Sequence, residues 1–177
     1  MKKLVVISSV VLCAVQSHAQ GQFSFSNFLL SPAAPIYVGV VGGTKAGSAY
    51  SVEYAYLAQP GVTDASQLNV EGGITTLNNG IFSGPDVTVA SYVGTISLQI
   101  RAWLTADGAT YSAAASSGHT GASTIMQVSL GNPNAIPPGT ATSLAGNLSS
   151  FAVAVPEPTT IALGVMGLSV LLFRRRK

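Results

Sequence analysis

The stretch Gly94-Thr-Ile-Ser-Leu-Gln-Ile-Arg-Ala-Trp-Leu104 decides how the middle of this chain folds. Its residues alternate between two faces. The aliphatic face consists of Ile96, Leu98, Ile100, Ala102 and Leu104. The more polar face consists of Thr95, Ser97, Gln99, Arg101 and Trp103. A repeat of two residues is that of a β-strand, and we expect this strand to bury its aliphatic face and expose the polar one.

Similar short patterns occur along the rest of the chain, at 22–28, 36–41, 50–58, 86–93, 123–130 and 148–155. After the central stretch, Asp107-Gly108 is a strong turn signal, so we expect 109–112 to be the return strand of a hairpin. Residues 64–68 predict one helical turn, capped by Thr63 or Asp64. About eight strands separated by Gly, Pro and Asn turns predict an all-β domain, an antiparallel β-sandwich or jelly roll.

The C-terminus has a different composition. Pro156-Glu157-Pro158 is followed by an apolar run, 159–173, and by Arg174-Arg175-Arg176-Lys177. As a helix the run is roughly 22 Å long, and snorkelling arginines with local thinning let it cross a hydrocarbon core of about 30 Å. The basic end stays in the cytoplasm, which places residues 20–155 outside.

This order of Pro-Glu-Pro, one hydrophobic helix and a basic cluster resembles the PEP-CTERM sorting signal of Gram-negative bacteria. The resemblance implies that an exosortase, a membrane-embedded cysteine protease, recognises Glu157 and the basic cluster and removes the tail during sorting to the surface. It also implies a small β-sandwich as the exported domain. The alternative is an ordinary C-terminal anchor that is never processed.

The N-terminus has the three parts of a secretory signal peptide. Met1-Lys2-Lys3 is basic, 4–15 is apolar, and Ser17-His18-Ala19 provides small residues at the cleavage site. We therefore expect export through the Sec translocon and cleavage between Ala19 and Gln20. Cys13, the one cysteine, leaves with residues 1–19, so the exported domain 20–155 has no thiol chemistry and no disulfide.

The exported domain carries very little charge. Between residues 20 and 155 two cations, Lys45 and Arg101, face five carboxylates, which gives a net charge of −3. Nucleic-acid binding depends on neutralising phosphates with many cations, so this composition excludes a nucleic-acid partner. The basic cluster at the C-terminus belongs to targeting and indicates no ligand.

Candidate chemistry is sparse. His119 lies in the polar loop 116–121, where Asp107 would orient it and Ser116 or Ser117 would be the nucleophile of a triad. A solvated loop histidine is the preferred interpretation, and we predict no catalytic residue and no enzyme. One histidine without cysteine does not make a zinc site, and the carboxylates lack the clustering that calcium prefers. We expect neither metal nor cofactor.

Trp103 lies on the polar face beside Arg101, where it either stacks on a sugar or belongs to the core, the preferred interpretation. Trp103 and His119 are the two possible ligand contacts. The predicted function is therefore a non-enzymatic exported surface or extracellular-matrix protein, associated with exopolysaccharide or biofilm. The alternative is a carbohydrate-binding module or carbohydrate-active enzyme, with loops converging around Trp103, His119 and Asp107.

Overall fold

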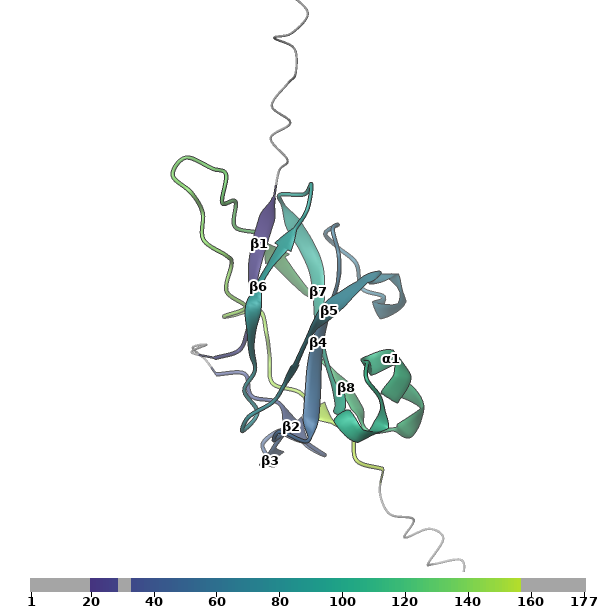
Figure 1. The fold of residues 1–177 in the computed structure, drawn as a ribbon. Coiled ribbons are helices and arrows are strands. Elements are labelled where there is room, and N and C mark those ends of the chain that lie inside the picture. Colours follow the sequence, from purple (N-terminus) through teal and green to yellow (C-terminus); the bar gives the residue numbers. More distant parts are fainter. Residues whose placement is uncertain (1–19, 29–32, 157–177) are drawn as a thin grey trace, which may run out of the picture.

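The computed structural model describes residues 20–28 and 33–156, in which strands form three sheets and helices are short (Figure 1). The expected all-β, mainly antiparallel architecture is confirmed. The predicted signal peptide 1–19, the motif residues after Pro156, the predicted helix 159–173 and the basic cluster 174–177 lie outside the described residues. Within the described ranges, no helix is long and apolar enough to cross a membrane.

The largest sheet is built around the strand that the central stretch predicts, β7 (Thr95–Leu104). From Ser97 to Leu104, β7 pairs antiparallel with the full length of β4 (Tyr50–Leu57), whose other edge pairs with β5 (Val70–Thr76). The opposite edge of β7 is shared by β8 (Thr120–Ala122) and β9 (Met126–Ser129). Strand β7 is therefore the centre of the five-stranded sheet.

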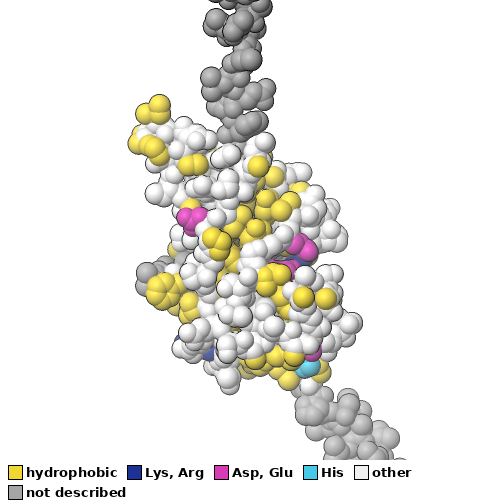
Figure 2. Space-filling model, viewed as in Figure 1, with side chains coloured by type: hydrophobic (Ala, Val, Ile, Leu, Met, Phe, Trp, Pro, Cys, Tyr) yellow, Lys and Arg dark blue, Asp and Glu magenta, His cyan; other side chains and the backbone are white. Residues whose placement is uncertain are grey.

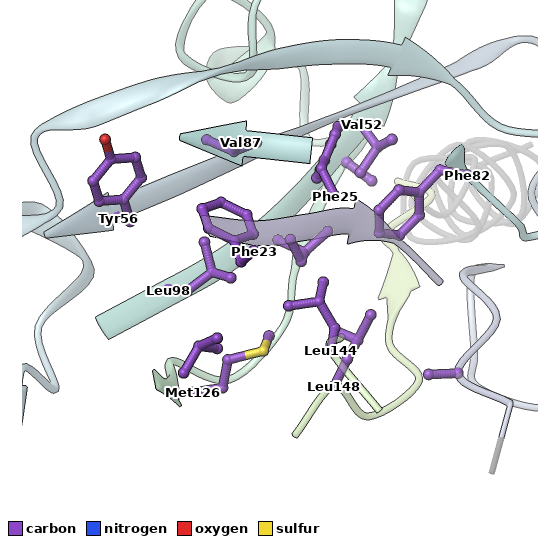
Figure 3. Close-up of a cluster of buried hydrophobic side chains, with 14 of the residues drawn as sticks. Phe23, Phe25, Val52, Tyr56, Phe82, Val87, Leu98, Met126, Leu144 and Leu148 are labelled. Atoms are coloured by element: carbon purple, nitrogen blue, oxygen red, sulfur yellow. The ribbon is translucent and has the colours of Figure 1, made fainter. Parts of the chain in front are cut away.

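A second layer covers the aliphatic face of this sheet. It consists of β1 (Gly21–Ser26) and β6 (Ser83–Val89), which pair antiparallel. The rings of Phe23 and Phe25 meet Tyr54 edge-on, with centroids 5.6 Å and 5.2 Å apart. Buried aliphatic side chains such as Leu98 complete this core (Figure 3). Two layers with an apolar interior are compatible with the expected sandwich.

The third sheet pairs the last strand of the domain with two strands near its beginning. It contains β10 (Ala152–Val153), β2 (Tyr37–Val38) and β3 (Thr44–Lys45), in that order. The β10–β2 pair is parallel, unlike the antiparallel pairing expected from the sequence. Its hydrogen bonds run from Tyr37 N to Phe151 O at 2.9 Å and from Gly39 N to Val153 O at 2.8 Å.

The expected return strand at 109–112 is wrong. After β7 the chain forms η2 (Thr105–Asp107), α1 (Tyr111–Ala114) and η3 (Ala115–Ser117), and β8 is the strand that returns. The physical reason is a helix cap: the Thr110 side chain accepts a hydrogen bond from Ala113 N at 3.2 Å. The predicted helical turn after residue 63 is confirmed as η1 (Ala65–Gln67), with Asp64 as its N-cap.

The expected exposure of the polar face of β7 is also wrong. Gln99 and Arg101 are each 8% exposed, and Ser97 and Trp103 are fully buried. Helix α1 packs on β7, and a small apolar cluster of Ala55, Val62 and Leu68 forms on this side of the sheet. Strand β7 is therefore covered on both faces.

Replacing Gly121 by Ala is expected to destabilise the protein by roughly 1–3 kcal/mol, as overpacking does. A Cβ on Gly121 would overlap the Ala152 carbonyl, which is backbone and has no rotamer to change. Gly47→Ala is the matched control, because a Cβ there meets nothing within 4 Å. Thermal unfolding of the two purified variants compares them, and equal Tm values would contradict the close approach of β8 and β10.

Candidate functional site

Arg101 is buried on the covered face of β7, at the centre of a polar network that reaches the surface at Glu71. Its Nη1 donates to Glu71 Oε1 on β5 at 2.5 Å, and its Nη2 donates to the Ala65 carbonyl of η1 at 3.1 Å. Its Nε donates to Gln99 Oε1 at 3.0 Å. A buried charge is tolerated when it is paired and hydrogen-bonded, and here three separate segments supply the partners.

Glu53 of β4 stands opposite Arg101 in the β4–β7 register and is 2% exposed. One carboxylate oxygen accepts from Tyr111 N at 3.4 Å, and the other, Oε1, has no hydrogen-bond partner. Burial raises the pKa of Glu53, and the nearby Glu71 carboxylate raises it further. The Tyr111 N–H and the Arg101 charge act in the opposite direction and do not cancel the rise.

A hollow of about 360 Å³ opens above this network. Its walls combine a carboxylate, a guanidinium, an aromatic ring and two hydroxyls, and they consist of Ala65, Ser66, Leu68, Glu71, Arg101, Tyr111, Ser112 and Ala115. The Arg101 Cζ lies 5.4 Å from the centroid of the Tyr111 ring. The hollow therefore presents hydrogen-bond donors and acceptors beside an aromatic ring.

The sequence contains no signal for this network. Glu53, Glu71 and Arg101 lie on three strands, so their proximity follows from strand pairing and not from spacing along the chain. The alternation in 94–104 predicts that Arg101 lies on a solvent-facing strand face, but the structure buries this residue.

Asp107 and His119 do meet, as the triad hypothesis required. His119 Nδ1 lies 2.7 Å from Asp107 Oδ2. Ser117 instead donates to the Ala114 carbonyl at 2.8 Å and accepts from the backbone N of His119 at 3.1 Å. The nearby Ser117 hydroxyl, and then the His119 ring, lower the pKa of the Asp107 carboxyl. Among the described hydrogen bonds, none joins a serine hydroxyl to the His119 ring.

Trp103 is fully buried, as the preferred core interpretation predicted, and is no exposed sugar-stacking platform. Its Nε1 donates to the Gly108 carbonyl at 2.8 Å, and its ring meets Tyr111 edge-on with centroids 6.5 Å apart. Leu104 N donates to the His119 carbonyl at 3.1 Å, so the predicted contacts do lie at one corner of the sheet. The hollow above Arg101 is not lined by Trp103, His119 or Asp107.

The described residues contain no group of three or more His, Cys, Asp and Glu side chains that could hold a metal ion.

The chain leaves the domain at the same corner. After β10, Ala154 N donates to the Thr120 carbonyl of β8 at 3.0 Å. Pro156, the first residue of the Pro-Glu-Pro motif, lies beside Gly118, where an added Cβ would be 3.1 Å from the proline Cγ. The motif therefore starts directly at the folded surface, two residues after the hydrogen bond that Ala154 N donates.

The family model of the PEP-CTERM protein-sorting motif matches residues 154–177. The chain carries this motif, as its similarity to PEP-CTERM proteins predicted. The motif implies an exported protein that is sorted to the cell surface, with an exosortase as its processing partner. Comparison with curated proteins and with solved structures finds no match.

Replacing Glu53 by Gln is expected to remove a pH dependence of stability. Because the pKa of Glu53 is raised above 4.5 in the folded protein, the folded state keeps a proton that the unfolded state releases. The free energy of unfolding of the wild type should therefore fall as the pH rises from 4.5 through the folded pKa. The slope for one proton is at most about 1.4 kcal/mol per pH unit.

Urea unfolding between pH 4 and pH 8 measures this difference between wild type and Glu53→Gln. Asp64→Asn is the control, because hydrogen bonds from Ser66 lower the pKa of Asp64 below 3.8. The stability that the ionised Asp64 contributes is therefore fully present above pH 3.8 and is lost only in more acidic solution. Parallel stability curves for the wild type and Glu53→Gln would contradict the assignment.

Proposed function

We propose that this protein is a non-enzymatic surface or extracellular-matrix protein that an exosortase sorts through its C-terminal signal and that associates with exopolysaccharide or biofilm. The observation that carries the proposal is the sorting motif at residues 154–177, which begins where the β domain ends. In this proposal the motif directs the protein to the cell surface, and the mostly β domain is the part that is exported.

The proposed route has three steps. Residues 1–19 direct the chain through the Sec translocon and are cleaved between Ala19 and Gln20. Residues 159–173 then hold the chain in the inner membrane, with Arg174, Arg175, Arg176 and Lys177 on the cytoplasmic side. The exosortase finally recognises Pro156, Glu157 and Pro158 together with the basic cluster, and the β-sandwich is released to the surface or matrix.

The absence of enzymatic activity is part of the proposal. A hydroxyl nucleophile needs a base within hydrogen-bonding reach, and Ser117 contacts the backbone of His119 instead of its ring. The Asp107–His119 pair has a simpler role on this geometry: it joins η2 to the start of β8 at the edge of the sheet.

The alternative is a carbohydrate-binding module or a carbohydrate-active enzyme of the cell surface. The hollow above Arg101 favours it, because Tyr111, Glu71 and two serine hydroxyls line the same space. Affinity electrophoresis in gels containing polysaccharide separates the two functions. Retardation that disappears when Ser112→Trp fills the hollow would favour the alternative, whereas equal mobility with and without polysaccharide would count against it.

Replacing Pro156, Glu157 and Pro158 by alanines is expected to keep the tail on the protein. The intact mass of the wild type should begin at Gln20 and end within about five residues of Pro156, since processing removes the helix and the basic cluster. In a strain without the exosortase, and in the alanine variant, the mass should include residues up to Lys177.

A wild-type protein that retains its whole tail in both strains would contradict sorting and would leave a permanently anchored β domain. Extra mass on the processed wild type would identify glycosylation or covalent attachment.

A further inference from the structure

Two exposed apolar segments, 39–41 and 154–156, follow the paired strands β2 and β10 at the same end of the domain. We propose that the surface made by Val40, Val41, Lys45, Val155 and Pro156, here called the exit surface, contacts the outer face of the inner membrane while the C-terminal tail is anchored. This inference rests on the proposed anchoring by residues 159–173, and it names the surface of the domain that the anchor brings onto the lipid.

The register of β10 and β2 places these residues at one end of the domain. Ala152 is opposite Tyr37 and Val153 is opposite Val38, in the same chain direction. Gly39 N donates to the Val153 carbonyl, after which 39–43 turn back into β3 and 154–156 run beside β8, so both segments lie at the end of the domain where β2 and β10 stop. In Figure 1, β2 and β3 lie at the lower end, to which the yellow-green C-terminal segment also runs.

The apolar side chains of the exit surface are exposed. Val40 is 68% exposed, Val41 59% and Val155 44%. The hairpin that carries the first two is held by its backbone: Val40 N donates to the Val38 carbonyl at 3.0 Å, and Gly43 N donates to the Val40 carbonyl at 3.1 Å. Figure 2 shows hydrophobic side chains at the lower end of the domain, as well as over its middle and upper parts.

The charge at this end suits an anionic lipid surface. Lys45 is exposed and lies on β3, opposite Tyr37. The other cation of the described residues, Arg101, is buried in its ion pair with Glu71. Asp107 is the carboxylate near the exit, and His119 pairs with it. A lysine beside exposed valines is the combination that interfacial segments use.

The tether is short enough to bring the exit surface to the headgroups. From Pro156 to Thr159 there are three residues, which span at most about 11 Å when extended. The headgroup layer on one side of a bilayer is about 5–8 Å thick. With residues 159–173 in the membrane as proposed above, this short tether keeps the exit surface close to the headgroups and raises the local concentration of a weak contact.

The contact should end when the tail is removed. Three valines, one proline and one lysine are too few to hold a soluble domain on a membrane by themselves, since stable anchoring takes a stronger signal. Cleavage at the motif would thus release the domain from both the helix and the lipid surface.

Fluorescence quenching tests the inference in the full chain without its signal peptide, residues 20–177, from which Cys13 is absent. The exported sequence has no cysteine, so Val41→Cys can carry a single environment-sensitive dye. Ile136→Cys is the matched control, because Ile136 is a fully exposed aliphatic residue in the loop 131–142, at the opposite end of Figure 1. Both labelled proteins are reconstituted into phosphatidylglycerol–phosphatidylethanolamine vesicles that contain headgroup spin-labelled lipid.

We expect quenching at position 41 to be several-fold stronger than at position 136, and to vanish when the chain is ended after Pro158. Equal quenching at the two positions, in protein that floats with the vesicles after alkaline washing, would overturn the inference while leaving the anchor intact. A full chain that does not float would overturn the anchor itself, and the lipid contact with it. Circular dichroism of the labelled variants checks that both are folded.

Discussion

The burial of both faces of β7 is the constraint on which the rest of the structure depends. Its aliphatic face is covered by β1 and β6, as an alternating strand requires. Its other face carries Ser97, Gln99, Arg101 and Trp103, and each of these polar groups must find a partner once water is excluded. Gln99 donates to the Ser123 carbonyl, and Ser97 donates to the Gln59 carbonyl, so both flanking loops are held to the strand.

The same requirement explains the short helices. Trp103 Nε1 donates a hydrogen bond to the Gly108 carbonyl. This bond holds the chain that follows η2 directly over β7. Thr110 then caps α1, and Tyr111 presents its N–H to Glu53 and its ring to Arg101. The covering segment is thus organised by the polar side chains beneath it, and one oxygen of Glu53 is left without a hydrogen-bond partner.

Much of the strand framework could be predicted, because a period of two is visible wherever one face is apolar. This identified β1, β4, β7 and β9, and the Asp64 cap identified η1. Strand β5 was missed because Gly72 and Gly73 interrupt its alternation, and Gly73 adopts a φ of 67°. The exposed polar face was predicted wrongly, since no pattern in 105–117 shows that this segment folds back over β7.

The candidate site shows the same division. Asp107 and His119 are near one another in sequence, and the segment between them brings their side chains together, as the triad hypothesis required and the preferred interpretation of a solvated histidine did not. Glu53, Glu71 and Arg101 come from three strands and depend on the β5–β4–β7 register, which a single sequence does not reveal. Of the two interpretations of Trp103, an exposed platform or a core position, the structure supports the core position. Its burial follows from the segment 105–117 that covers β7, which the sequence did not predict.

The position of the sorting motif relative to the core has a consequence for processing. Phe151 and Val153 are buried in the main core, and β10 is hydrogen-bonded to β2. The buried core residues of the described chain end at Val153, three residues before Pro156. A cut at or beyond Pro156 therefore removes no core side chain and no strand pairing. The domain keeps its last strand, so sorting can separate it from the tail without changing the packing that holds it folded.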